Sequence, residues 1–135
     1  MIAVSLPIKA QFYDLDPMNV VWHGNYLRFF EQARSALFQH IGYDYDDMLA
    51  SGYVFPIVTL QAKYVAPLTY GQAAEITASL VEWEYRLIID YVIRASDTGV
   101  ILTKGQSKQI AVRQDTGEAC FACPEILIDK VKACL

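Results

Sequence analysis

With 135 residues, 54% of them hydrophobic, the chain has the size of one globular domain, expected over residues 1–135. No apolar run approaches the ~20 residues of a membrane span, and the net charge of −4 argues against a nucleic-acid partner. Three cysteines, an odd number, favour a reducing cytoplasm over a disulfide framework, and the first residues show no signal peptide.

The first half of the chain predicts a strand followed by a long helix. Residues 2–14 have the pattern of a strand. From Gly24 to Ile41, apolar residues recur at helical spacing, in a stripe wider than a one-sided surface helix needs. A short second helix should begin at Asp44 or Asp46 and end at Gly52.

The second half predicts long strands. Four segments are rich in Val, Ile, Thr and Tyr and are bounded by turn residues, namely 53–65, 74–84, 86–96 and 100–113. Short connections between consecutive strands predict an antiparallel meander, and Gly105 inside the last strand predicts a β-bulge. Pro124 should open a terminal helix that packs Ile126, Leu127 and Val131 on the sheet.

Together these elements predict an α+β fold. A helix that is apolar on most sides must be enclosed, so a curved antiparallel sheet of about five strands should wrap around it. Such a sheet has long edges, and long antiparallel edges usually pair with a partner. We therefore expect a homo-oligomer, either a dimer or a dimer of dimers.

The segment Gln11 to Arg34 contains the candidate site. Asp16 lies in a loop, seven residues before His23, where the helical pattern begins. A helix N-terminus offers unsatisfied N–H groups and partial positive charge, so a carboxylate beside it suits attack on a polarised carbonyl. This arrangement indicates a hydrolase built on one acid, although an Asx turn or a helix cap is the more common role of an isolated aspartate.

The motif from Asp14 to Tyr26, DLDPMNVVWHGNY, resembles that of the 4-hydroxybenzoyl-CoA thioesterase family, which has the hotdog fold and includes YbgC-like enzymes. The following FEQAR, Phe30 to Arg34, is also typical of that family. Asn19 stands where the family usually has glycine, but asparagine tolerates left-handed backbone better than most residues. The element pattern matches over nearly the whole chain, whereas only its first third is a specific signature.

The resemblance implies an acyl-CoA thioesterase that releases a free acid and coenzyme A without a metal or a separate cofactor. Asp16 would act as nucleophile or as general base on water, and the backbone N–H of His23 would stabilise the oxyanion. Trp22 would contact the substrate, and Val58 and Thr59 of a partner subunit would close the pocket.

The resemblance also suggests where the phosphates of coenzyme A bind. Arg86 follows Glu82 to Tyr85, a segment similar to the family's Glu-Trp that precedes phosphate-binding basic residues. A solvated surface charge is an equally common role for Arg86. Lys63 and Lys104 are weaker candidates, because exposed lysines often protect strand edges.

Two other functions fit parts of the sequence. A hotdog hydratase or dehydratase would need a His–acid pair, for which His23 and Glu31 are available. A non-catalytic module that binds acyl-CoA or acyl carrier protein is the other alternative. The acyl group is open, because four aromatic residues suit either a pocket or the core: Trp22, Phe29, Tyr53 and Tyr64.

Three short motifs are discounted. Cys120 to Cys123 has the spacing of a redox motif or a zinc half-site, but no second pair of ligands accompanies it. Two Asp-Thr-Gly tripeptides, at 97–99 and 115–117, match that of aspartic proteases. Both fall between predicted strands, where Asp and Gly are ordinary turn residues.

Overall fold

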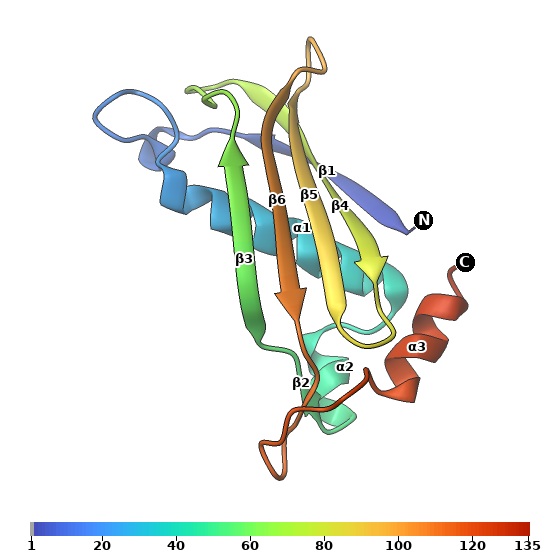
Figure 1. Cartoon of the computed structure of the whole chain (residues 1–135). Helices are drawn as coiled ribbons and strands as arrows, with labels where there is room; N and C mark the ends of the chain where they lie inside the picture. Colours follow the sequence, from blue (N-terminus) through green and yellow to red (C-terminus); the bar gives the residue numbers. More distant parts are fainter. Residues whose placement is uncertain (1) are drawn as a thin grey trace.

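A five-stranded antiparallel sheet packs across one long helix, α1 (Tyr26–Ile41), in the computed structural model, which describes residues 2–135 (Figure 1). Met1, which the predicted domain includes, lies outside the described residues. This is the α+β architecture expected from the sequence. The remaining elements are β1 (Ala3–Lys9), η1 (Phe12–Asp14), η2 (His23–Asn25), α2 (Tyr45–Ala50), β2 (Tyr53–Val54), β3 (Ile57–Tyr64), β4 (Ala73–Glu82), β5 (Leu87–Ala95), β6 (Ile101–Gln109), β7 (Val112–Arg113) and α3 (Glu125–Lys132).

The sheet has the strand order β1-β4-β5-β6-β3, with β1 and β3 at its edges (Figure 1). Strands β4, β5 and β6 form the expected meander, but β3 pairs with β6. The meander prediction is therefore wrong for β3. The connection after β3 crosses the end of the sheet, since Ala66 N–H donates to the Leu102 carbonyl and Gly71 N–H donates to the Ala10 carbonyl.

One predicted strand was too long and two were interrupted. The first strand ends at Lys9, because residues 12–14 form the 3₁₀ helix η1. The predicted strand 53–65 divides at Phe55-Pro56 into β2 and β3. Similarly, 100–113 divides into β6 and β7, and β7 pairs with β2 in a small second sheet.

The predicted bulge at Gly105 is wrong. Gly105 is in regular register with both Tyr91 and Ala62. A Cβ at Gly105 would lie 2.6 Å from ring atoms of Phe30. The glycine therefore serves the close approach of α1 to the sheet, which is the other common reason for glycine inside a strand.

The core lies between α1 and the concave face of the sheet. Tyr26, Phe30, Ala33 and Leu37 of α1 are all at most 2% exposed. They pack in one hydrophobic cluster with the inward residues of β4 and β5, including Ile76, Ala78, Ile89, Tyr91 and Ile93.

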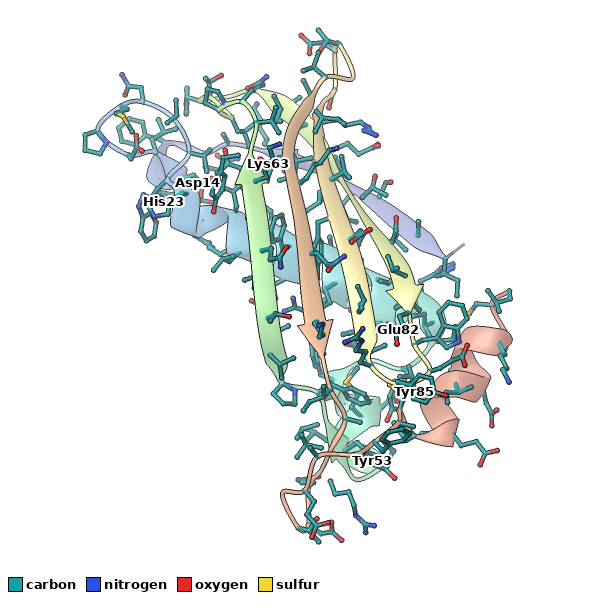
Figure 2. All side chains as sticks on the ribbon, viewed as in Figure 1. Asp14, His23, Tyr53, Lys63, Glu82 and Tyr85 are labelled. Atoms are coloured by element: carbon teal, nitrogen blue, oxygen red, sulfur yellow. The ribbon has the colours of Figure 1, made fainter. Side chains whose placement is uncertain are left out.

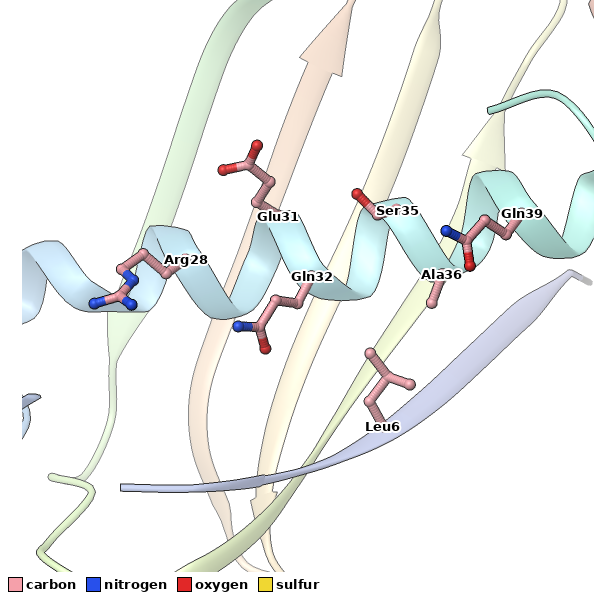
Figure 3. Close-up of a pocket in the computed structure, with 7 residues that line it drawn as sticks. All are labelled: Leu6, Arg28, Glu31, Gln32, Ser35, Ala36 and Gln39. Atoms are coloured by element: carbon pink, nitrogen blue, oxygen red, sulfur yellow. The ribbon is translucent and has the colours of Figure 1, made fainter. Parts of the chain in front are cut away.

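The opposite side of α1 is polar and exposed. It carries Arg28, Glu31, Gln32 and Gln39, which are all exposed (Figure 3). The expectation that α1 must be enclosed on most sides is therefore wrong for this face. The apolar stripe is wide because the flanking Phe29 and Phe38 are also buried, while Leu27 is 43% exposed.

One charged residue of α1 is buried against the sheet. The Arg34 guanidinium donates to the hydroxyl groups of Tyr45 (3.1 Å) and Tyr91 (3.3 Å). The Tyr91 hydroxyl also exchanges a 2.7 Å hydrogen bond with Ser107. Arg34 thus connects α1 to α2 and to β5, which fixes the position of the long helix on the sheet.

The helix ends follow the signals in the sequence. Gly42 ends α1 in left-handed conformation, with φ of +83°, and Asp44 caps α2 through its side chain. In α3, Leu127 and Val131 are buried as predicted, but Ile126 is 42% exposed. No helix among residues 2–135 has the length and apolarity to cross a membrane.

Candidate active site

The loop that carries Asp16 is closed by its own hydrogen bonds. Asp16 N–H donates to the Val20 carbonyl (2.9 Å), and Asn19 N–H donates to the Asp16 carbonyl (3.0 Å). Asn19 has a φ of +62°, so it adopts the left-handed backbone expected of a residue in a glycine position. Met18 N–H donates to Asp16 Oδ1 at 2.8 Å, which is the Asx turn considered for this aspartate.

Asp14 holds the loop against the start of the helix. Its carbonyl oxygen accepts from Trp22 N–H and from Asn25 Nδ2, each at 2.9 Å. Its carboxylate accepts from Gln11 N–H at 2.9 Å and lies 3.9 Å from a nitrogen of Arg28. Asp14 is 4% exposed, so it supports the loop from inside the fold.

The helical segment begins at His23, as the sequence predicted. The 3₁₀ helix η2 covers His23–Asn25 and continues directly into α1. Among the described residues, no hydrogen-bond acceptor is recorded for the amides of His23 and Gly24, as expected of the first N–H groups of a helix. These amides are available to a ligand.

Asp16 and His23 line the same pocket, which has a volume of about 300 Å³. The remaining lining is mostly apolar, with Val20, Val65 and Pro67 among its members. Figure 2 shows His23 and Asp14 at one end of the sheet, near Lys63. The pocket is thus lined by a carboxylate residue and by the first residue of η2, whose N–H has no recorded acceptor. A carboxylate and a free backbone donor are the two groups needed to attack a carbonyl and stabilise the resulting charge.

Two tyrosines complete the pocket. The Tyr26 hydroxyl accepts from Leu68 N–H at 3.3 Å, and burial raises the pKa of Tyr26, so its hydroxyl stays protonated at neutral pH. The Tyr64 hydroxyl donates to the His23 carbonyl at 3.0 Å. Sequence reasoning proposed Tyr64 for an aromatic pocket but missed this bond, and it missed Tyr26 although that residue ends the motif.

The other proposed substrate contacts lie outside the pocket of a single chain. Trp22 is 49% exposed and its ring covers Gly24, where a Cβ would come within 2.4 Å of the ring. Val58 and Thr59 belong to the opposite end of β3 from Tyr64. Their contribution from a partner subunit stays a prediction.

The candidate phosphate-binding residues lie at two different ends of the sheet. Arg86 is the last residue of the turn between β4 and β5 and pairs with Glu82 at 3.1 Å. Figure 2 shows Glu82 and Tyr85 far from His23, so Arg86 of the same chain is remote from the pocket. Lys63 and Lys104 are direct cross-strand partners, and Figure 2 shows Lys63 near the pocket.

A larger hollow of about 530 Å³ lies between the polar side of α1 and β1 (Figure 3). Glu31 lines this hollow, whereas His23 lines the pocket of Asp16. The structure therefore does not bring together His23 and Glu31, the pair that the sequence offered for a hydratase. Ser35 and Glu31 both line this hollow, but no hydrogen bond between them is recorded among the described residues, so we place the chemistry in the smaller pocket.

The discounted motifs have structural roles. Among residues 2–135, no three His, Cys, Asp or Glu side chains gather as a metal site requires. Cys120 and Cys123 are free thiols, and burial raises the pKa of Cys123 to about 12. Asp115 of the second Asp-Thr-Gly makes two hydrogen bonds to Arg113 in an exposed turn.

Comparison with known proteins agrees with this fold and this motif. YneP of Bacillus subtilis strain 168, which carries a provisional acyl-CoA thioesterase name, is 29% identical over 110 residues, or 81% of this chain and 79% of YneP. The crystal structure of DHNA-CoA thioesterase from Staphylococcus aureus matches with a TM-score of 0.83 and 27% identity, over 98% of this chain and 93% of that one.

A variant of 4-hydroxybenzoyl-CoA thioesterase, solved in complex with 4-hydroxybenzoyl-CoA, has the same fold. Its TM-score is 0.83 at 19% identity, over 96% of this chain and 99% of that one. The sequence profile of the Thioesterase-like superfamily matches residues 10–128. The chain therefore has the hotdog fold and belongs to the Thioesterase-like superfamily.

Proposed function

We propose that this protein is an acyl-CoA thioesterase in which Asp16 carries the reaction. Thioester hydrolysis as the reaction class rests on membership of the Thioesterase-like superfamily and on relatives named as acyl-CoA thioesterases. The observation that supports the mechanism is the pocket that Asp16 shares with His23, the first residue of η2, whose amide has no recorded acceptor.

Asp16 supplies the attacking group in this proposal. Its Oδ1 accepts from Met18 N–H, which fixes the carboxylate, while no partner among the described residues is recorded for Oδ2. Oδ2 either attacks the thioester carbonyl to form a mixed anhydride, which water then hydrolyses, or removes a proton from an attacking water. Both routes break the C–S bond and release the free acid.

The leaving group makes one carboxylate sufficient. A thiol has a pKa near ~8.5, so coenzyme A leaves as a thiolate without a strong general acid. The charge that develops on the carbonyl oxygen needs donors, and the amides of His23 and Gly24 are free to serve. Removal of one such donor in other enzymes costs about 3–4 kcal/mol of transition-state stabilisation.

The proposal includes a second copy of the chain. If β3 pairs with its own copy in antiparallel register about the middle of the strand, the partner's Val58 and Thr59 come within two residues of Tyr64, which lines the pocket. The same pairing turns the partner's sheet end for end. The end that carries Arg86 then lies beside the end with Asp16, where Arg86 and the Lys63–Lys104 pair are proposed to bind the phosphates of coenzyme A.

A thiol-release assay on acetyl-, hexanoyl-, palmitoyl- and benzoyl-CoA tests the proposed function. The acyl group hydrolysed fastest also defines the substrate class. A hydratase would change enoyl absorbance without thiol release, and a binding module would do neither.

The decisive variant is Asp16→Asn, because the amide oxygen preserves the hydrogen bond from Met18 N–H while removing the charge. We expect kcat to fall about a thousandfold or more, with the free energy of unfolding within about 0.5 kcal/mol of the wild type. Asp97→Asn, in an exposed turn, is the matched control and should keep full activity. If Asp16→Asn kept more than about a tenth of kcat, Asp16 would have no essential role.

A further inference from the structure

Tyr64 connects the edge strand to the start of the helix. It is the last residue of β3, and its hydroxyl donates to the carbonyl of His23, 41 residues away, at 3.0 Å. Its ring packs edge-on against Tyr26 at a centroid distance of 5.0 Å, and Tyr26 is 2% exposed. Among the described residues, this is the one recorded hydrogen bond between β3 and η2.

The acceptor of this bond belongs to the peptide that joins His23 to Gly24. A peptide unit is planar and trans, so the direction of its C=O also fixes the direction of its N–H. The Tyr64 hydroxyl therefore restrains the Gly24 amide, which is one of the two free donors at the start of η2.

The other side of this peptide is also restrained. The ring of Trp22 lies against Gly24, where a Cβ would be only 2.4 Å from a ring carbon. The ring of His23 lies 5.1 Å from that of Trp22 and 6.4 Å from that of Tyr64. The peptide is thus held between an indole ring and a phenol hydroxyl, and neither of these two contacts occupies its N–H.

We infer that Tyr64 is a positioning residue for the oxyanion donors, a role that rests on the thioesterase function proposed above. Electrostatic stabilisation of an oxyanion depends on donors that are fixed before the reaction starts. A hydrogen bond to the carbonyl also polarises the peptide and strengthens its N–H as a donor. Tyr64 therefore acts through the His23–Gly24 peptide and not through contact with the acyl group.

Tyr64→Phe tests this role, because it removes the hydroxyl and keeps the ring packed on Tyr26. With hexanoyl-CoA or benzoyl-CoA, whichever is hydrolysed faster, we expect kcat to fall about tenfold, less than the loss of a whole donor. KM should stay within about twofold of the wild-type value, because ground-state binding is untouched. The pH profile of the reaction should keep its wild-type shape. Tyr70→Phe, at an exposed tyrosine whose ring packs on Phe12, should change neither constant.

Two non-natural substitutions separate the hydrogen bond from simple packing. Tyr64→4-aminophenylalanine restores a donor and should recover most of kcat. Tyr64→4-methoxyphenylalanine adds an oxygen without a donor and should not recover it. If Tyr64 had only a structural role, the 4-aminophenylalanine variant would have a kcat no higher than that of the 4-methoxyphenylalanine variant.

Asp16→Asn in the same assay separates this inference from the proposed function. If Asp16→Asn is inactive while Tyr64→Phe keeps kcat within about twofold, the positioning role is overturned and the thioesterase mechanism stands. If Tyr64→Phe raises KM alone, Tyr64 contacts the substrate and the positioning role is likewise overturned. If Asp16→Asn stays active, both proposals fail together.

Discussion

Gly105 of β6 and the ring of Phe30 of α1 are in direct contact. A Cβ on Gly105 would lie 2.6 Å from two ring carbons of Phe30 and 3.1 Å from the Gln61 carbonyl oxygen. The Phe30 ring stacks on Tyr91, the cross-strand partner of Gly105, at 4.6 Å and 13°. The missing side chain thus opens the space in which α1 approaches the sheet.

Gly105→Ala should therefore destabilise the fold, although alanine is accepted in most strands. We expect a loss of about 1–3 kcal/mol in the free energy of unfolding, the usual cost of overpacking a core. Urea denaturation would measure it. Phe30→Leu in the Gly105→Ala background should recover part of the loss, and additive effects of the two changes in a double-mutant cycle would contradict the contact.

The contrast between Gly105 and Asn19 shows what the sequence could predict. The backbone conformation of Asn19 is determined by its neighbours in the chain, because the tight turn between Asp16 and Val20 requires a left-handed residue. The motif indicated this conformation. The need for glycine at position 105 comes from Phe30, which lies 75 positions away in the chain. Sequence periodicity does not connect these two residues. The sequence therefore predicts a β-bulge at Gly105 and not the contact with Phe30.

The same distinction applies to the strands and the site. Strand identity follows local pattern and was largely correct, whereas the pairing of β3 with β6 depends on how residues 65–72 cross the sheet. Asp16 and His23 lie within one short motif, so the sequence predicted them together. The hydrogen bond from Tyr64 to His23 comes from a distant strand and was visible only in the structure.

Arg86→Ala should raise KM for the acyl-CoA substrate and leave kcat unchanged. A phosphate contact far from the thioester stabilises the ground state and the transition state equally. The comparison is between full acyl-CoA and the matching acyl-pantetheine, which lacks the nucleotide. Arg113→Ala, which removes another exposed arginine paired with an acid, is the control. An equal rise in KM for both substrates would mean that Arg86 does not bind the nucleotide phosphates.

The cysteines should differ sharply in reactivity. Only the thiolate reacts with disulfide reagents, and burial raises the pKa of Cys123 to about 12. At pH 8 its thiolate fraction is therefore about 10⁻⁴, while Cys134 is exposed. Titration with Ellman's reagent should label Cys134 rapidly and Cys123 only after unfolding. Rapid labelling of Cys123 in the folded protein would revive the redox interpretation of the Cys120–Cys123 motif.

The two edges of the sheet differ in their ability to pair with another chain. All eight residues of β3 are exposed, including Ile57, Val58 and Leu60, each at least 39% exposed. The opposite edge, β1, contains Pro7, which cannot donate a ladder hydrogen bond. A long, apolar edge without proline is a ready surface for strand pairing. We therefore expect β3, and not β1, to form the contact between two copies.

Leu60→Lys tests this assignment by placing a charge in the middle of β3, where two copies would bring like charges together. We expect light scattering to show a monomer at micromolar concentration. We also expect thioester hydrolysis to be lost, because the partner's Val58 and Thr59 no longer close the pocket. Ala3→Lys, on the exposed β1 edge, is the matched control and should stay a fully active dimer. A wild-type protein that is monomeric and fully active would contradict both the edge pairing and the shared site.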